Sequence, residues 1–201
     1  MIDFDEYARV SDEARATIKE QRSEFIGIAF PAPTQADFDA ALTRIQREHF
    51  DATHHCWAWR RVEEGELRAH GSDAGEPTGT AGRPILQAIE SASLLDTGVV
   101  VVRYYGGVKL GTGGLARAYR DAAREVLEIA PRERKILYDR IVVEVPFSVM
   151  SAVYRLLAPP DIVLAGETFG EPNVFELDVR RSRVARFLAL LEEKRISARR
   201  G

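Results

Sequence analysis

Two glycine-rich segments constrain what this 201-residue chain can fold into. The first covers residues 71–83 and the second covers residues 106–114, and a continuous apolar run over residues 97–105 leads directly into the second. Clustered glycine and proline interrupt regular structure, so both segments are predicted to be loops of unusual backbone. A strand that is apolar at nearly every position is typical of burial on both faces. The sequence therefore predicts a buried strand between two structured loops.

The remaining pattern predicts strands and helices that restart once along the chain. Before Pro131, strands are expected over residues 21–30, 54–62, 67–70 and 97–105, and helices over 34–50, 85–94 and 115–129. After the charged stretch 132–135, strands are expected over 140–147, 161–169 and 173–180, with helices after Ser148 and Ser182 as capping residues. Residues 196–200 are either a short last strand or a frayed end. The second pattern, β-α-β-β-α, opens a ferredoxin-like domain, so we expect domains at residues 1–131 and 139–201.

Composition excludes several classes of protein. Hydrophobic residues make up 45% of the chain and charged residues 29%, which is typical of a globular protein and not of a disordered one. The longest apolar run, residues 99–102, is far below the ~20 residues that a membrane span needs. The acidic first six residues lack the apolar core of a signal peptide. Cys56 has no second cysteine to pair with, so a cytoplasmic location is expected.

Charge is distributed unevenly along the chain. The formal net charge of −3 argues against a protein that coats nucleic acid indiscriminately. Residues 103–120 nevertheless contain four basic residues and no acidic one: Arg103, Lys109, Arg117 and Arg120. This local excess is compatible with RNA or phosphate ligands, and equally with ion pairs inside the fold.

A histidine–cysteine run, His54-His55-Cys56, invites a metal interpretation. Adjacent residues on a strand point to opposite faces, so only His54 and Cys56 share a side. Two ligands are too few for zinc, which takes at least three from the protein. We therefore expect a core thiol at Cys56 and no metal, and a nucleophilic Cys56 assisted by His54 is the alternative.

The first glycine loop carries candidate acids and hydroxyl groups. Asp73 and Glu76 could form an acid/base pair, while Thr78, Thr80 and the free N–H groups of the following helix could bind an anion. The structural alternative is that Asp73 or Thr78 caps that helix and that Glu76 pairs with Arg83.

The second glycine loop predicts an anion-receptive turn. Glycine N–H groups can approach a phosphate without interference from a Cβ atom, and Lys109 and Arg117 would add positive charge. The spacing is not that of a Walker A loop, and no acidic residue stands where a dinucleotide-binding fold requires one. We expect Lys109 to face solvent or to pair with Asp73 or Glu76, and the first loop to pack beside the second. Five glycines make the turn: Gly106, Gly107, Gly111, Gly113 and Gly114.

Two tyrosines precede this loop. An exposed Tyr104 or Tyr105 could stack on a base, with Arg103 neutralising phosphate. Since both tyrosines adjoin a buried strand, at least one of them is expected in the core.

Three runs of residues carry a resemblance to a known family. They are Ala52-x-His54-x-Cys56-x-Ala58, Asp73-x-Gly75-Glu76-Pro77-x-Gly79-Thr80-Ala81-Gly82, and the run over 103–119 that reads RYYGGVKLGTGGLARAY. Together they resemble the YigZ/IMPACT family over about residues 20–130, and the remainder is similar to the small domain that bacterial members append. Tyr105 stands where phenylalanine is usual, and Glu24 where members usually carry a basic residue.

The resemblance implies an α+β fold and a role in translation. Its first domain would be a two-layer domain of the ribosomal small-subunit protein domain-2-like type, as in elongation factor G domain IV and GHMP kinases, followed by a ferredoxin-like α/β sandwich. Eukaryotic relatives regulate translation, and the family implies no firm enzymatic activity and no cofactor. We expect a translation-associated regulator or binding protein that contacts RNA, the ribosome or a translation partner, with no membrane contact. The alternatives are a binder or enzyme for a phosphate-containing small molecule at the glycine-loop cleft, and a protein-interaction module without a ligand.

The candidate ligand- or RNA-binding residues follow from the two loops and the residues beside them. They are Asp73, Glu76, Thr78, Thr80, Arg103, Tyr104, Gly106, Gly107, Lys109, Gly111, Gly113, Gly114 and Arg117.

Overall fold

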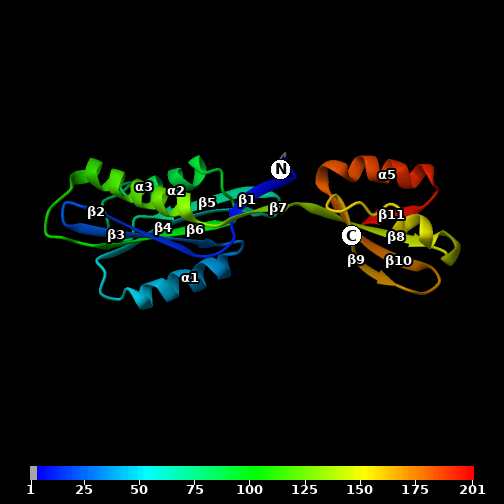
Figure 1. Cartoon of the computed structure of the whole chain (residues 1–201), viewed down its shortest axis with the longest axis horizontal. Helices are drawn as coiled ribbons and strands as arrows, with labels where there is room; N and C mark the ends of the chain where they lie inside the picture. Colours follow the sequence, from blue (N-terminus) through cyan, green and yellow to red (C-terminus); the bar gives the residue numbers. More distant parts are fainter. Residues whose placement is uncertain (1–3) are drawn as a thin grey trace. The chain divides into compact units, whose positions relative to one another are not determined.

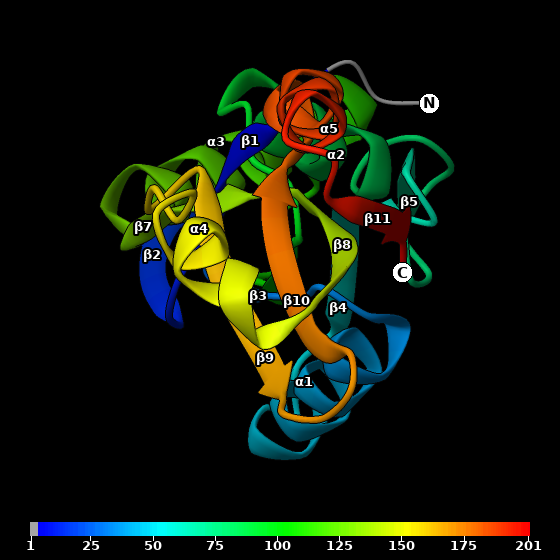
Figure 2. The same ribbon diagram turned by 90° about the vertical axis from the view of Figure 1, so that its right-hand side faces the viewer.

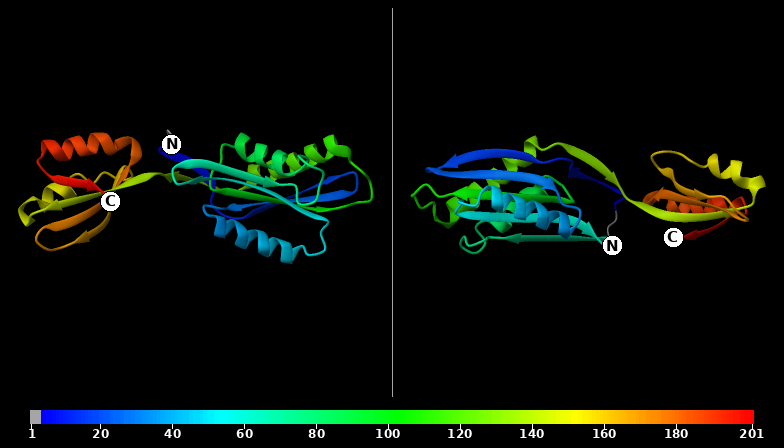
Figure 3. Two further views of the ribbon diagram at one scale, coloured as in Figure 1. Left: turned by 180° about the vertical axis from the view of Figure 1, so that it is seen from behind. Right: turned by 90° about the horizontal axis from the view of Figure 1, so that it is seen from below.

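The computed structural model describes residues 4–201, which form two compact mixed α/β units. The first unit spans residues 7–135. The second spans residues 136–201 and includes the short segment that precedes Tyr7. Figures 1 and 3 show that each unit consists of a sheet with helices packed on it. No helix within residues 4–201 is both long enough and apolar enough to cross a bilayer.

A five-stranded antiparallel sheet forms the first unit. Its order is β2-β3-β6-β4-β5, with bounds Ala14–Glu20, Ser23–Pro31, Thr97–Tyr104, His54–Glu63 and Glu66–Ser72. The central strand β6 is buried from Thr97 to Arg103, as its apolar sequence predicts. Across the sheet, Arg103 pairs in register with Phe25 on one side and with His54 on the other.

Helices cover both faces of this sheet (Figure 1). Helices α2 (Gly82–Ser91) and α3 (Gly111–Ile129) lie on one face, and α1 (Gln35–Glu48) lies on the other. The valines of β6 alternate between the two cores, with Val99 and Val101 toward α2 and α3, and Val100 and Val102 toward α1. This alternation is the period of two that a strand imposes on its side chains.

Two segments that the sequence analysis did not predict as strands form a small ribbon. Strands β1 (Glu6–Val10) and β7 (Arg132–Ile136) make a two-stranded sheet. The charged stretch 132–135, which was expected to mark the domain boundary, is therefore part of a strand, and the side chain of Arg9 bonds that of Glu133 at 2.7 Å across the ribbon. Strand β2 was missed as well, because its residues are largely polar.

The second unit is a four-stranded antiparallel sheet with two helices on one face (Figure 2). Its strand order is β11-β8-β10-β9, where β8 is Tyr138–Val145, β9 is Ile162–Thr168, β10 is Asn173–Arg180 and β11 is Ser197–Arg200. Helices α4 (Met150–Tyr154) and α5 (Val184–Glu193) pack their apolar residues against it. Of the two expectations for the C-terminal tail, the structure shows the short last strand.

Helix capping follows the sequence at one site and departs from it at two. Thr34 accepts the N–H of Asp37 and caps α1, as expected. Ser148 and Ser182 do not cap α4 and α5, since a 3-10 turn precedes each helix. The hydroxyl group of Ser182 instead bonds the carboxylate of Asp5 within the second unit.

Candidate functional site

The carboxylate of Asp73 is fully engaged by backbone at the start of α2. It accepts the N–H groups of Gly79, Ala81 and Gly82 at 2.7, 2.8 and 2.9 Å. Burial acts to raise the pKa of Asp73, but these three bonds outweigh it and lower the pKa below its ordinary value. Asp73 therefore caps α2, as the structural alternative proposed, and holds the first glycine loop closed.

The side chain of Glu76 is buried, and it joins the first glycine loop to strand β6 and helix α3. Its side chain is only 4% exposed. One carboxylate oxygen accepts from the guanidinium of Arg103 at 2.5 Å and from the hydroxyl of Tyr119 at 2.8 Å. The Nε2 atom of His54 lies 4.0 Å from the same oxygen. The partner of Glu76 is thus Arg103, and the pair with Arg83 that formed part of the structural alternative is not present.

Arg103 lies inside the first unit and does not form part of a contact surface. It is 5% exposed and sits between the rings of Phe25 and Tyr105, 5.4 and 5.3 Å from their centres. This position follows from its place at the end of β6, on the face that α3 covers. A buried guanidinium requires a charged partner, and Glu76 supplies it.

Cys56 belongs to the same buried cluster. Its thiol donates to the carbonyl oxygen of Asp73 at 2.9 Å, and burial raises its pKa to about 12. A thiol of that pKa stays protonated at neutral pH and is a poor nucleophile. The core thiol expected at Cys56 is confirmed. Within residues 4–201 no group of three or more metal-ligating side chains is present, and the absence of bound metal remains a prediction for elemental analysis.

Sequence reasoning missed two members of this cluster. Tyr119 was expected only as part of the helix over residues 115–129, although a buried tyrosine hydroxyl needs a polar partner. Ser23 accepts the N–H of Gly106 at 3.2 Å and lies 3.5 Å from the guanidinium of Arg103. The signal for Tyr119 was available in the sequence, whereas that for Ser23 depends on strand pairing.

The second glycine loop packs against a segment other than the expected one. A Cβ atom on Gly106 would lie 2.0 Å from the carbonyl oxygen of Arg22, in the turn between β2 and β3. The backbone that requires a glycine here is therefore that of residue 22, and not the first glycine loop.

Helix α3 begins inside the predicted loop. Gly111, Gly113 and Gly114 form its first turn, which contains no acidic residue and receives no side-chain cap. The first N–H groups of a helix lack partners within it and carry partial positive charge. Gly107 and Gly111 adopt positive φ angles of 84° and 68°, which turn the chain into the helix.

The basic residues of this loop remain exposed. Within residues 4–201, Lys109 and Arg117 have neither an ion pair nor a side-chain hydrogen bond. Tyr105 is 45% exposed. Tyr104 is half-buried, and its hydroxyl lies 3.1 Å from a carboxylate oxygen of Asp51. We expected at least one of the two tyrosines to be fully buried in the core, and neither is.

The two threonines of the first loop differ in accessibility. Thr78 is exposed. Thr80 is buried, and its hydroxyl donates to the carbonyl oxygen of Pro77 at 2.7 Å. The structure thus divides the predicted site residues into a buried network and an exposed set, and the exposed set contains the second glycine loop.

Comparison with known proteins gives consistent similarities. The family model of the Impact N-terminal domain matches residues 21–127. An IMPACT family member from Haemophilus influenzae is 32% identical over 175 residues, which cover 87% of this chain and 85% of the relative. The IMPACT family member YigZ from Escherichia coli is 32% identical over 155 residues, covering 77% of this chain and 76% of that protein. A crystal structure of a protein described as hypothetical is 26% identical, with a TM-score of 0.70 and 97% coverage of both chains.

Proposed function

This chain belongs to the IMPACT family, and from that premise we propose that it is a translation-associated binding protein that contacts RNA through the second glycine loop. The support is twofold. The signature residues resemble those of a family whose eukaryotic members regulate translation, and the loop presents exposed positive charge. A cytoplasmic location accords with this role.

The observation that carries the proposal is the separation of acidic from basic residues. Both acids of the first loop are turned inward, where Asp73 binds backbone N–H groups and Glu76 binds Arg103. Lys109, Arg117 and the first turn of α3 remain outward and unneutralised. A surface of this composition attracts the phosphate groups of nucleic acid.

The same arrangement favours binding over catalysis. An acid/base mechanism at the glycine loops needs a carboxylate that is free to exchange a proton with a ligand. Asp73 is held ionised by three backbone bonds, and the side chain of Glu76 is almost completely buried against Arg103. A phosphate-containing small molecule at the same loop is the second candidate, because the uncapped first turn of α3 would suit a single phosphate group.

The fold types implied by the resemblance form part of the proposal. The sequence β8-α4-β9-β10-α5-β11 with strand order β11-β8-β10-β9 supports a ferredoxin-like second domain. We assign the first domain to the ribosomal small-subunit protein domain-2-like type, with domains at residues 1–131 and 139–201. Limited proteolysis should cut first within residues 131–139 or between strands of the second domain, and first cleavage within residues 103–119 would oppose this division.

Salt-dependent binding of a fluorescently labelled oligouridine tests RNA contact. The double variant Lys109→Gln/Arg117→Gln should lower the slope of log affinity against log salt by about 1.4, since each phosphate contact to a single strand contributes roughly 0.7. Lys194→Gln/Arg186→Gln is the matched control, because both residues are exposed on the second unit and have no ion pair within residues 4–201.

Three outcomes separate the candidate functions. RNA binding at this loop is supported if the salt dependence of oligouridine affinity falls in the glycine-loop variant and does not fall in the control variant. A rise in melting temperature with phosphate compounds that is lost in the glycine-loop variant, without a salt-dependent affinity for oligouridine, favours the small-molecule candidate. Equal effects of the two double variants contradict the assignment of the loop.

A further inference from the structure

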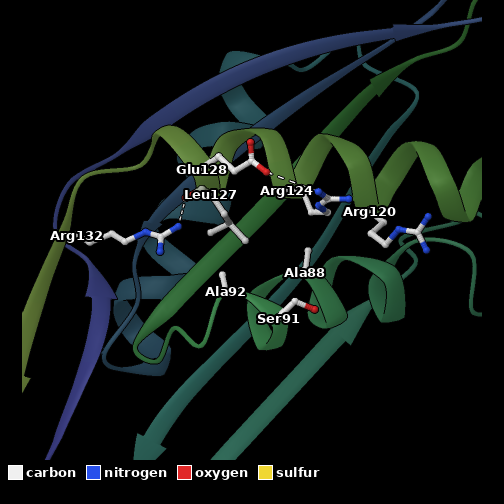
Figure 4. Close-up of a pocket in the computed structure, with 8 residues that line it drawn as sticks. All are labelled: Ala88, Ser91, Ala92, Arg120, Arg124, Leu127, Glu128 and Arg132. Carbon is white, nitrogen blue, oxygen red and sulfur yellow. Dashed lines mark hydrogen bonds and ion pairs between the residues drawn. The ribbon is translucent and has the colours of Figure 1, made fainter.

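A groove between α2 and the C-terminal half of α3 is separate from the glycine loops. Its volume is about 440 Å³, which lies within the range of roughly 300–1,000 Å³ typical of small-molecule sites. Figure 4 shows α3 along one side and the last turn of α2 along the other. The entire lining comes from the first unit.

The floor of the groove is apolar, and two of its three side chains are the small ones of alanine. Ala88 and Ala92 from the α2 side face Leu127 from α3 (Figure 4). Ala88 and Leu127 are only 3% and 1% exposed, so the apolar surface that is open to a ligand lies mainly on Ala92, at the end of α2. Ser91 stands at the edge, where its hydroxyl donates to the carbonyl oxygen of Gln87 at 2.8 Å.

Arginines line the groove and retain most of their donors. Arg132 is oriented by one bond to the carbonyl oxygen of Leu127 at 2.7 Å. Arg124 lies 3.7 Å from Glu128, and both side chains are more than half exposed. Arg120 is likewise 3.7 Å from Asp121. Separations of this length are too great for good hydrogen bonds, so the guanidinium groups of Arg120 and Arg124 remain available.

The carbonyl groups at the two helix C-termini beside the groove do not account for the presence of three arginines there. A helix C-terminus attracts cations through its unpaired carbonyl groups. Here the carbonyl oxygens of Ala88, Ile89 and Glu90 accept backbone N–H groups. At the end of α3 the carbonyl oxygen of Leu127 accepts from Arg132. The positive charge at the groove therefore exceeds what the helix ends require.

We propose that this groove binds a phosphomonoester of a flat, uncharged ring compound, of about the size of a mononucleotide. The phosphate group lies on Arg124 and Arg132, with Arg120 nearby, and the ring lies against Ala92 at the end of α2. Guanidinium groups suit this ligand because they bind phosphate oxygens in pairs and stack on flat rings. This site does not depend on RNA binding at the glycine loop.

Isothermal titration with AMP, adenosine and inorganic phosphate tests the site on the full chain. AMP should bind more tightly than either fragment. Arg124→Gln should weaken AMP binding about tenfold or more, in line with loss of a charge-assisted bond. Lys109→Gln/Arg117→Gln is the matched control at the other basic site and should leave AMP binding unchanged.

Charge changes at the edge of the groove give a test that does not remove any lining arginine. Ser91→Glu should weaken AMP binding about threefold and Ser91→Lys should strengthen it by a similar factor, as expected for one unit charge a few ångströms away in water. Thermal unfolding verifies that each variant is folded. The proposal is wrong if AMP does not bind, if adenosine or phosphate binds as tightly, or if AMP affinity responds to the glycine-loop variant and not to Arg124→Gln.

Discussion

The two glycine loops of the first unit orient their charged side chains in opposite directions. In the first loop, Asp73 and Glu76 point inward and are bound by backbone N–H groups, Arg103 and Tyr119. In the second, Lys109 is exposed without a partner in the described part of the chain, and so is Arg117, which follows the loop in α3. One loop is fastened to the core by its side chains, and the other exposes its side chains to solvent.

This difference shows that the chemistry of a loop depends on which of its groups have internal partners. If the acids of the first loop were exposed, they would offset the charge of Lys109 and Arg117. Because these acids are bound internally, they do not neutralise Lys109 and Arg117, although the whole chain carries a net charge of −3. A structural role for the first loop thus creates the conditions for a binding role of the second.

Removal of the buried acid should have the largest effect on this arrangement. Glu76→Ala leaves the guanidinium of Arg103 buried and unpaired, so we expect a loss of about 3–5 kcal/mol in the free energy of unfolding. Chemical denaturation measures it. The control is Glu66→Ala, which removes an exposed pair with Arg68 and should cost at most about 1 kcal/mol. Similar losses in the two variants would show that the Glu76–Arg103 pair does not fasten the first loop.

Alanine substitution at two glycines of the second loop should have opposite effects. At Gly106 the new Cβ would collide with the carbonyl oxygen of Arg22, and we expect a loss of roughly 2–3 kcal/mol from overpacking against backbone. At Gly113 a Cβ meets nothing within 4 Å, and alanine should stabilise the first turn of α3 by about 0.5–1 kcal/mol. Thermal unfolding of both variants tests this, and a stable Gly106→Ala protein would contradict the close approach.

The contribution of Asp73 should depend on pH. Its pKa is lowered in the folded state, with burial opposing the three N–H bonds that lower it. Its stabilising effect is therefore complete above the unfolded value of about 3.9 and is lost as the pH falls through the folded value. Asp73→Ala should cost about 1–2 kcal/mol at neutral pH, and the difference from the parent protein should shrink below about pH 4. A pH-independent difference in denaturation free energy would exclude an ionised cap.

The main elements of both units could be predicted from sequence because their apolar patterns are local. The valines of β6 and the apolar face of α1 determine these two elements to within two residues, and the apolar face of α3 determines its end but not its start, which lies four residues earlier, at Gly111. Strands β1, β2 and β7 could not be predicted in the same way. Strand β7 is almost entirely charged, β2 is more than half polar and β1 has only five residues, and all three form strands because another strand lies beside them to pair with.

The residue types of the candidate site could be predicted from sequence, but which of its side chains are buried and which face solvent could not. The glycines, acids and cations of both loops stand out in the sequence, and so does the family resemblance. The burial of Arg103 depends on Glu76, which is 27 residues away in sequence and reaches it only when the loop folds over the end of β6. No local pattern separates an arginine with such a partner from one that faces solvent.

Lys109 should show the smallest effect on stability and therefore the sharpest contrast with Glu76. It is exposed and has no partner within residues 4–201, so Lys109→Ala should change the free energy of unfolding by no more than about 0.5 kcal/mol. The same variant should weaken oligouridine binding and reduce its salt dependence by about one phosphate contact. If stability instead falls by about 3 kcal/mol or more while binding of oligouridine and phosphate compounds is unchanged, Lys109 is a structural residue like Arg103. The second loop would then be fastened inward like the first, and its role as an anion site would be lost.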